Sequence, residues 1–161
     1  QRALLYGEIG KTNIEFTTVK IEALINSCTV ISQNYEHRGK KLVVELDDRL
    51  PKEIESDDTL LIRILTNLIK NGFEASKDDD VKLTINLKES SAIEFSVWNH
   101  EEIPEDIHPR IFQEFFSTKD GNFRGIGTYS VKLFTDLIGG KVDFVSGSNG
   151  TTFSLLIPIK H

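Results

Sequence analysis

Apolar residues recur at helical spacing in three stretches of the chain. The first predicts a helix over 20–38, with Gly39 behind it as a left-handed cap. The second predicts a helix over 58–76, whose first turn the Asp57 side chain would cap. The third predicts a helix over 128–138. At roughly 100° per residue, the apolar positions of the second helix fall in one arc of about 140°, its expected core face: Leu61, Ile64, Leu65, Leu68, Ile69, Gly72 and Ala75.

Alternation of apolar and polar residues predicts strands between these helices. One lies over 42–46, and two more, over 81–87 and 93–97, are joined by a polar turn as an antiparallel hairpin. A second hairpin over 142–157 would turn at Asn149-Gly150. Mixed helices and hairpins favour an α/β two-layer sandwich with a mostly antiparallel sheet, covered by helices on one face.

Two connections remain between the hairpins. A short helix is expected after Pro104, through Ile111 and Phe112. The polar, glycine-containing stretch 117–127 has no period, so we interpret it as a mobile loop.

Length and charge narrow the classes of protein. The 161 residues suit one domain, and the lone Cys28 cannot form an internal disulfide. The net charge of -6 disfavours nucleic acid as a partner. No apolar run approaches the roughly 20 residues that span a bilayer, so we expect a soluble piece. We expect it in the cytoplasm, whether or not the full-length protein is anchored in a membrane. Because the chain starts with Gln1, we expect a fragment of a longer protein, with 1–13 as the tail of a preceding element and 14–161 as the domain.

Two groups of residues could carry chemistry. Asn67 and Asn71 share a stripe at the border of the second helix's core face, and an amide oxygen there suits Mg²⁺, which takes few protein ligands beside phosphates. Plain polar helix surface is the alternative. Glycines 125 and 127 come directly before the third helix, where backbone N–H groups can approach a phosphate. Lys119 and Arg124 nearby could offset triphosphate charge, or could be ordinary surface charges.

Five segments, in this order, resemble the ATP-binding catalytic domain of sensor histidine kinases, a branch of the GHKL group with the Bergerat fold. They match its N, G1, F, G2 and final Gly-Thr boxes over nearly the whole chain. The segments are NLIKNGFEA (67–75), VWNHEEIP (97–104), IFQEFFSTK (111–119), GIGTYSVKLFTDLIGG (125–140) and NGTTFSLLIP (149–158).

The resemblance implies a nucleotide site. Asn71 would coordinate the Mg²⁺ that bridges the ATP phosphates, with Asn67 in support, and Lys119 would reach the terminal phosphates. The other implied ATP-binding residues are Arg124, Gly125, Gly127 and Thr128 around the phosphates, Asn99, Ile103, Phe112, Phe115 and Phe116 around the adenine or the lid, and Thr151 or Thr152 at the rear. For the apolar residues, ordinary core packing is an equal alternative.

Asn67 separates two activities within this group. Relatives that hydrolyse ATP, such as gyrase B and the MutL-type repair proteins, carry Glu at this position as the general base. An amide cannot remove a proton, so we expect slow hydrolysis. The resemblance therefore favours a phosphotransferase.

The G1 segment departs from the family's Asp-x-Gly-x-Gly motif. It has Asn99 in place of Asp, lacks both glycines and is one residue shorter. A carboxylate accepts from the adenine amine and repels the oxygen of guanine, whereas an amide can do either, so we expect a weaker preference for ATP over GTP.

The five matching segments do not include the histidine that such a kinase phosphorylates. None of His37, His100, His108 and His161 is assigned as acceptor, so the histidine is expected on a dimerisation domain outside this piece, with a response regulator downstream. The leading hypothesis is thus the catalytic domain of a histidine kinase. The alternatives are a degenerate nucleotide-binding or docking module, or an anti-sigma-factor serine kinase.

Overall fold

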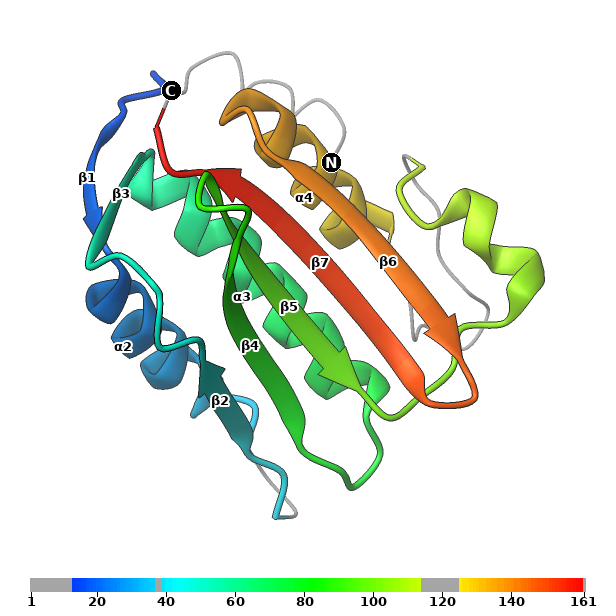
Figure 1. Cartoon of the computed structure of the whole chain (residues 1–161). Helices are drawn as coiled ribbons and strands as arrows, with labels where there is room; N and C mark the ends of the chain where they lie inside the picture. The colour runs from blue at the N-terminus through cyan, green and yellow to red at the C-terminus, as the bar shows by residue number, and fades with distance from the viewer. Residues whose placement is uncertain (1–12, 37–38, 114–124, 161) are drawn as a thin grey trace.

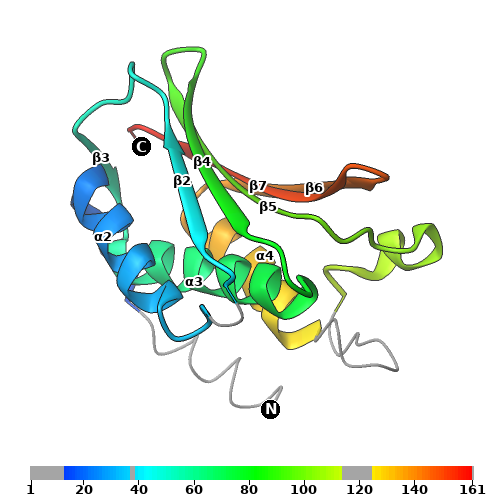
Figure 2. The ribbon, with the colours of Figure 1, turned by 90° about the horizontal axis from the view of Figure 1, so that it is seen from below.

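A computed structural model describes residues 13–36, 39–113 and 125–160. These residues form two layers, a twisted five-stranded sheet and three helices that run along one of its faces (Figure 2). The helices are α2 (Ile21–Ser32), α3 (Asp58–Ala75) and α4 (Gly125–Leu137), and a 3-10 helix, η1, covers Glu105–Arg110. The α/β two-layer sandwich expected from the sequence is therefore confirmed.

The five-stranded sheet has the order β2-β4-β5-β7-β6 (Figure 1). Its first pair is parallel and the other three pairs are antiparallel, so the sheet is mixed and mostly antiparallel. Both predicted hairpins, β4–β5 and β6–β7, are present, but the second turns at Ser148 and Asn149 rather than at Asn149-Gly150, because Gly150 already pairs with Gly147. The strands are β2 (Leu42–Leu46), β4 (Val81–Lys88), β5 (Ala92–Asn99), β6 (Lys141–Gly147) and β7 (Gly150–Pro158).

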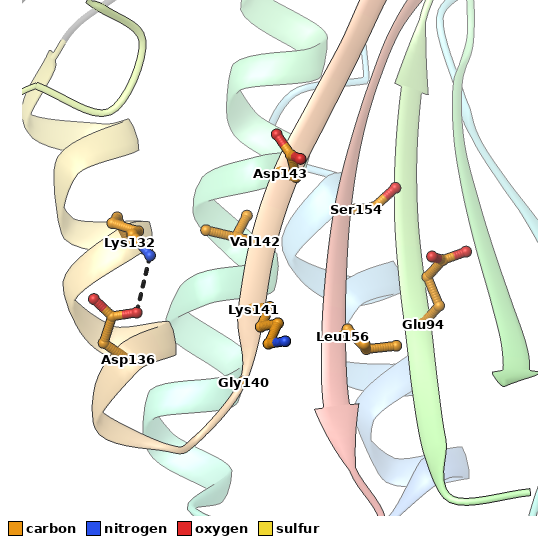
Figure 3. Close-up of a pocket in the computed structure, with 9 residues that line it drawn as sticks. All are labelled: Glu94, Lys132, Asp136, Gly140, Lys141, Val142, Asp143, Ser154 and Leu156. Carbon is orange, nitrogen blue, oxygen red and sulfur yellow. Dashed lines mark hydrogen bonds and ion pairs between the residues drawn. The ribbon is translucent and has the colours of Figure 1, made fainter. Parts of the chain in front are cut away.

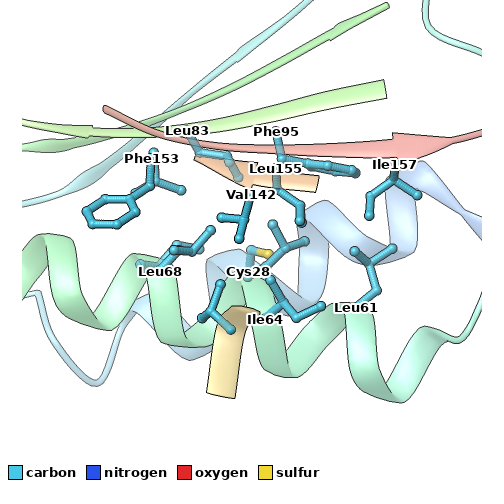
Figure 4. Close-up of a cluster of buried hydrophobic side chains, with 14 of the residues drawn as sticks. Cys28, Leu61, Ile64, Leu68, Leu83, Phe95, Val142, Phe153, Leu155 and Ile157 are labelled. Atoms are coloured by element: carbon cyan, nitrogen blue, oxygen red, sulfur yellow. The ribbon is translucent and has the colours of Figure 1, made fainter. Parts of the chain in front are cut away.

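Helix α3 is the central helix of the layer beneath the sheet. Asp57 caps it as predicted, with its side chain accepting from the Leu60 N–H at 3.0 Å. Six of the seven predicted core positions are buried, Ala75 is half-buried, and Leu60 and Phe73 are buried as well. Apolar side chains of α3 pack against inward-facing residues of β4, β5, β6 and β7 (Figure 4). This apolar packing fixes the position of α3, and with it that of Asn67 and Asn71, relative to the sheet.

Lys40 fixes the far end of α3. Its side chain is buried, and Nζ donates to the carbonyls of Phe73 and Ser76, both at 3.1 Å. A cation at a helix C-terminus satisfies carbonyls that have no partner within the helix. The C-terminus of α3 is therefore capped by the side chain of Lys40, which comes shortly before β2 in the sequence.

Three predicted boundaries are wrong. Helix α2 ends at Ser32, because Gln33, Asn34 and Tyr35 donate to carbonyls three residues back and tighten the chain into turns. Gly39 does have a left-handed φ of 79°, but it follows those turns and does not cap α2. Helix α4 starts at Gly125, so the last three residues assigned to the 117–127 loop are helical; 117–124 lie outside the described residues.

A small second sheet was not predicted. Strands β1 (Thr17–Lys20) and β3 (Glu53–Ser56) pair antiparallel, beside α2 (Figure 1). Each strand buries one apolar residue, Val19 or Ile54. The pairing ties the chain before α2 to the segment that leads into α3.

Candidate functional site

One of the two predicted asparagines, Asn67, contacts α4 from α3. Asn67 Nδ2 donates to Ser130 Oγ at 3.3 Å, which joins α3 to the second turn of α4. One turn earlier on α3, the Arg63 guanidinium lies 4.8 Å from the centroid of the Phe134 ring. These contacts set the two helices side by side. They therefore fix the spacing between the asparagine stripe and the glycine-containing start of α4.

Asn71 lies one turn beyond Asn67 and is half-buried. Its Nδ2 atom is buried, and no described residue accepts a hydrogen bond from it. A buried donor without a partner costs free energy, so such atoms often mark places where a ligand or water binds. The amide of Asn71 thus has unused hydrogen-bonding capacity, and its oxygen is a ligand of the kind Mg²⁺ takes.

The start of α4 is held in place from the other side. Thr128 is buried, and its hydroxyl donates to the Ile111 carbonyl at 2.5 Å. Gly125 and Gly127 lie in the first turn of this 13-residue helix. The free N–H groups and the dipole of a helix N-terminus favour an anion. The structure thus places the predicted phosphate-binding glycines where that field is strongest.

Part of the expected site cannot be placed. Phe115, Phe116, Lys119 and Arg124 lie outside the described residues, so the roles assigned to them stay predictions.

The segment after β5 is fixed by side-chain hydrogen bonds. Asn99 is 4% exposed, and its Oδ1 accepts from the backbone N–H of Glu101 at 2.9 Å. The buried Thr151 hydroxyl donates to the Glu101 carbonyl at 2.7 Å and lies 2.7 Å from Ser146 Oγ. Ser146 Oγ in turn accepts from the Ile103 N–H at 2.7 Å. The loop from Asn99 to Ile103 is therefore bonded to β6 and β7.

The expected apolar wall is part of the core. Ile103 is buried at 3% exposure. Phe112 packs edge-to-face against Phe144 and Phe153, with ring centroids 6.0 and 6.1 Å away. These contacts agree with the alternative of ordinary core packing, and they leave the contact of either residue with adenine a prediction.

Several residues of this arrangement were not identified from the sequence. Ser130 and Ser146 meet their partners across 63 and 43 residues of chain. His108 donates from Nε2 to the Ile103 carbonyl at 2.8 Å and packs edge-on against Phe144. Serines and a histidine at such separations give no local spacing signal. Only the folded arrangement reveals them.

A separate pocket of about 620 Å³ opens at the β6 edge of the sheet (Figure 3). It is lined from α4, β5, β6 and β7, and includes both partners of the Lys132–Asp136 ion pair at 3.1 Å. None of the predicted site residues lines it. Its lining mixes three acidic side chains with two basic ones, which favours no single charge of ligand, and we assign it none.

Two features are absent from residues 13–36, 39–113 and 125–160. In that part of the chain, no three His, Cys, Asp or Glu side chains come together as a metal site. Nor does any helix there combine the length and apolar character needed to cross a bilayer.

Comparison with known proteins gives the family. Residues 56–161 match the model of the histidine kinase-, DNA gyrase B- and HSP90-like ATPases. The chain belongs to this ATPase family. The matched region contains α3, α4 and the loop after β5, so it includes every placed residue of the candidate site.

Curated relatives narrow the likeness within the ATPase family. A probable C4-dicarboxylate sensor kinase of Halalkalibacterium halodurans is 32% identical over 137 residues, which are 77% of this chain and 25% of the relative. The sensor protein CitS of the same organism is 34% identical over 113 residues, 66% of this chain and 21% of the relative. This chain thus spans about a quarter of the length of these sensor proteins.

Solved structures agree. The nucleotide-free catalytic domain of the histidine kinase ThkA superposes with a TM-score of 0.78 at 29% identity, covering 91% of this chain and 99% of that domain. Full-length ShkA in complex with AMPPNP gives a TM-score of 0.83 at 25% identity, covering 97% of this chain and 34% of ShkA. The fold is that of histidine kinase catalytic domains.

Proposed function

We propose that this chain is the ATP-binding catalytic domain of a two-component sensor histidine kinase. Residues 14–161 form the domain and 1–13 the tail of a preceding element. It binds ATP with Mg²⁺ between α3 and the start of α4, and positions the γ-phosphoryl group for transfer to a histidine on a separate dimerisation domain. A response regulator then takes the phosphoryl group. The domain works in the cytoplasm.

The observation that carries the proposal is the pairing of α3 with α4. Asn67 bonds to Ser130, and Asn71 keeps a buried, unpartnered amide nitrogen beside it. The first turn of α4 contains two glycines. A helix N-terminus for phosphates and an amide oxygen for their metal are the elements that a Mg²⁺-nucleotide needs. The family match and the likeness to kinase catalytic domains support the same site.

The residues present fit the metal and the nucleotide. Bound Mg²⁺ would supply charge neutralisation on the phosphates. Asn71 would hold it through its amide oxygen, while Gly125, Gly127 and Thr128 would shape the backbone around the phosphates. Lys119 and Arg124 would add positive charge. Asn67 carries no carboxylate, so this chain positions the phosphoryl group without activating water at that residue.

One experiment tests the binding step. The chain is titrated with a fluorescent ATP analogue with and without Mg²⁺, and Asn71→Ala is compared with wild type. We expect saturable, Mg²⁺-dependent binding in wild type and loss of the Mg²⁺ dependence in Asn71→Ala, with unchanged circular dichroism. Absence of saturable binding at about 1 mM, near -4 kcal/mol, would instead favour the degenerate docking module.

The transfer step needs the full protein. A version that includes the dimerisation domain should become labelled from γ-³²P-ATP in an acid-labile, base-stable form, as a phosphohistidine is. Acid-stable label on a separate partner protein would point to the serine kinase alternative.

A further inference from the structure

The amide of Asn99 has a fixed orientation. The side-chain atom that lies 2.9 Å from the Glu101 backbone nitrogen must be the oxygen, because a backbone N–H can only donate. The amino group, Nδ2, is therefore the other end of this amide. No described residue accepts a hydrogen bond from Nδ2. The Nδ2 atom is also not completely buried. Nδ2 is the end of Asn99 that a ligand can reach.

The Glu101 backbone cannot easily move away from Asn99. Thr151 donates its single hydroxyl hydrogen to the Glu101 carbonyl. The contact between Ser146 and Thr151 must then run from the Ser146 hydroxyl to the Thr151 oxygen, and Ser146 Oγ accepts from the Ile103 N–H. Every hydroxyl hydrogen in this chain of bonds is used. These hydrogen bonds hold the loop at Glu101 and at Ile103. They leave the Thr151 hydroxyl no hydrogen to donate to a ligand.

The end of β5 is equally confined. Gly150 has a φ of 102°, and a Cβ there would collide with the Asn99 carbonyl oxygen and come within 2.8 Å of Trp98 Nε1. Asn99 also pairs with Thr151 in the β5–β7 register. The Asn99 backbone is thus packed against the turn of the β6–β7 hairpin. A rotated amide would leave the partly buried Glu101 N–H without its acceptor.

We propose that Asn99 reads an acceptor on the purine base, so that the site takes 6-oxopurine nucleotides at least as well as ATP. This rests on the proposed function, together with the place beside the adenine that the family resemblance implies for Asn99. A carboxylate at this position would offer an acceptor, which matches the 6-amino group of adenine. Asn99 instead offers the N–H donors of Nδ2, which match the 6-oxo group of hypoxanthine or guanine.

A nucleotide series tests this on the unmodified chain. ATP, inosine triphosphate and purine riboside triphosphate differ in the group at position 6, which is a donor, an acceptor or absent, and inosine triphosphate also carries a hydrogen on N1, where the other two have an acceptor. Each competes with the fluorescent ATP analogue in the presence of Mg²⁺. We expect inosine triphosphate to bind as tightly as ATP within about threefold, or more tightly, and guanosine triphosphate to follow it. ATP binding at least about tenfold tighter than inosine triphosphate would overturn the proposal.

Asn99→Asp changes the chemistry of the same position at nearly the same size. One oxygen can still accept from Glu101, and the other turns the free end of the side chain into an acceptor. We expect the ratio of ATP affinity to inosine triphosphate affinity to rise about tenfold or more. Asn26→Asp is the matched control, because it adds the same charge on the exposed face of α2 and should leave the ratio unchanged. An unchanged ratio in folded Asn99→Asp would overturn the proposal.

The series also separates this inference from the function on which it depends. If no triphosphate displaces the analogue, nucleotide binding itself fails and the proposed function falls with the inference. If all three bind with Mg²⁺ dependence but ATP is strongly preferred, the function stands and only the reading of Asn99 is wrong. Should Asn99→Asp fail to fold by circular dichroism, the unmodified chain still decides through its three ligands.

Discussion

Asn67 on α3 donates a hydrogen bond to the hydroxyl of Ser130 on α4, across 63 residues of sequence. This bond lies beside the unpartnered amide of Asn71 and near the glycines that start α4. It is a direct polar link between the two helices that would bind the metal and the phosphates. Its strength therefore bears on both stability and ligand binding.

A double-mutant cycle measures this link. Asn67→Ala and Ser130→Ala should each lower the free energy of unfolding by about 1 kcal/mol, and the double variant should lose less than the sum. The expected coupling is about 0.5–1 kcal/mol, from urea unfolding followed by circular dichroism. Full additivity would show that the bond contributes nothing in solution. Thr29→Ala is a useful control, because its hydroxyl bonds only within α2, to the Ile25 carbonyl.

The sequence predicted the elements with strong periodicity and missed the short ones. Helix α3 was predicted almost to the residue, because its apolar arc and the Asp57 cap are local signals. Strands β1 and β3 have four residues each and bury one apolar side chain each, so too few positions alternate to indicate a strand. Their pairing across 33 to 39 residues is a tertiary effect.

The candidate site divides in the same way. Asn67, Asn71 and the glycines of α4 could be found because they stand in short motifs. The bonds of Ser130, Ser146 and Thr151 could not, since they depend on how strands and helices far apart in sequence come together. The orientation of the Asn99 amide also needed the position of the Glu101 N–H.

Gly150→Ala should destabilise the β6–β7 hairpin and the loop beside it. The left-handed φ of 102° disfavours any side chain, and the new Cβ would meet the Asn99 carbonyl. We expect a loss of about 2 kcal/mol or more in urea unfolding. Gly147→Ala is the matched control in the same hairpin, because a Cβ there meets nothing within 4 Å. Equal stability of the two variants would contradict the close packing of Gly150.

Cys28 should behave as an inert core thiol. It is 1% exposed, and burial raises its pKa from 9.0 to about 11. In the folded chain a thiol-alkylating reagent should therefore react only as fast as the protein unfolds. Rapid alkylation at pH 8 without denaturant would show that Cys28 is accessible.

The same pKa shift predicts a loss of stability at high pH. Above pH 9 the unfolded thiol ionises while the folded one stays protonated, so the stabilisation is complete below pH 9 and declines as the pH rises towards 11. The full effect is at most about 3 kcal/mol. The difference in unfolding free energy between wild type and Cys28→Ala, measured from pH 7 to pH 11, should shrink accordingly. A constant difference would contradict the shift.

Asp47 should stabilise the end of β2 in its ionised form. Its carboxylate accepts from the Arg49 side chain and backbone and from the Leu87 N–H, and the Arg49 hydrogen bond is the main cause that holds its pKa well below the ordinary value. The stabilisation is present above the unfolded pKa of about 3.9 and is lost as the pH falls towards the folded one. Asp47→Asn should therefore unfold at lower urea than wild type at pH 7, with the gap narrowing below about pH 4. If the difference in urea midpoint between wild type and Asp47→Asn does not change with pH, the stabilisation comes from packing and not from the charge of Asp47.

Asn67→Glu tests whether the absence of a carboxylate at this position keeps hydrolysis slow. A carboxylate beside the phosphates can accept a proton from an attacking water, which an amide cannot do, and general base catalysis contributes about 10²-fold or more. At saturating ATP and Mg²⁺ we expect phosphate release by Asn67→Glu to exceed that of wild type by at least about tenfold. Asn67→Gln controls for the longer side chain without adding a base, and should stay at the wild-type rate. If Glu and Gln give the same rate while both variants bind the fluorescent analogue, residue 67 does not determine whether this site hydrolyses ATP.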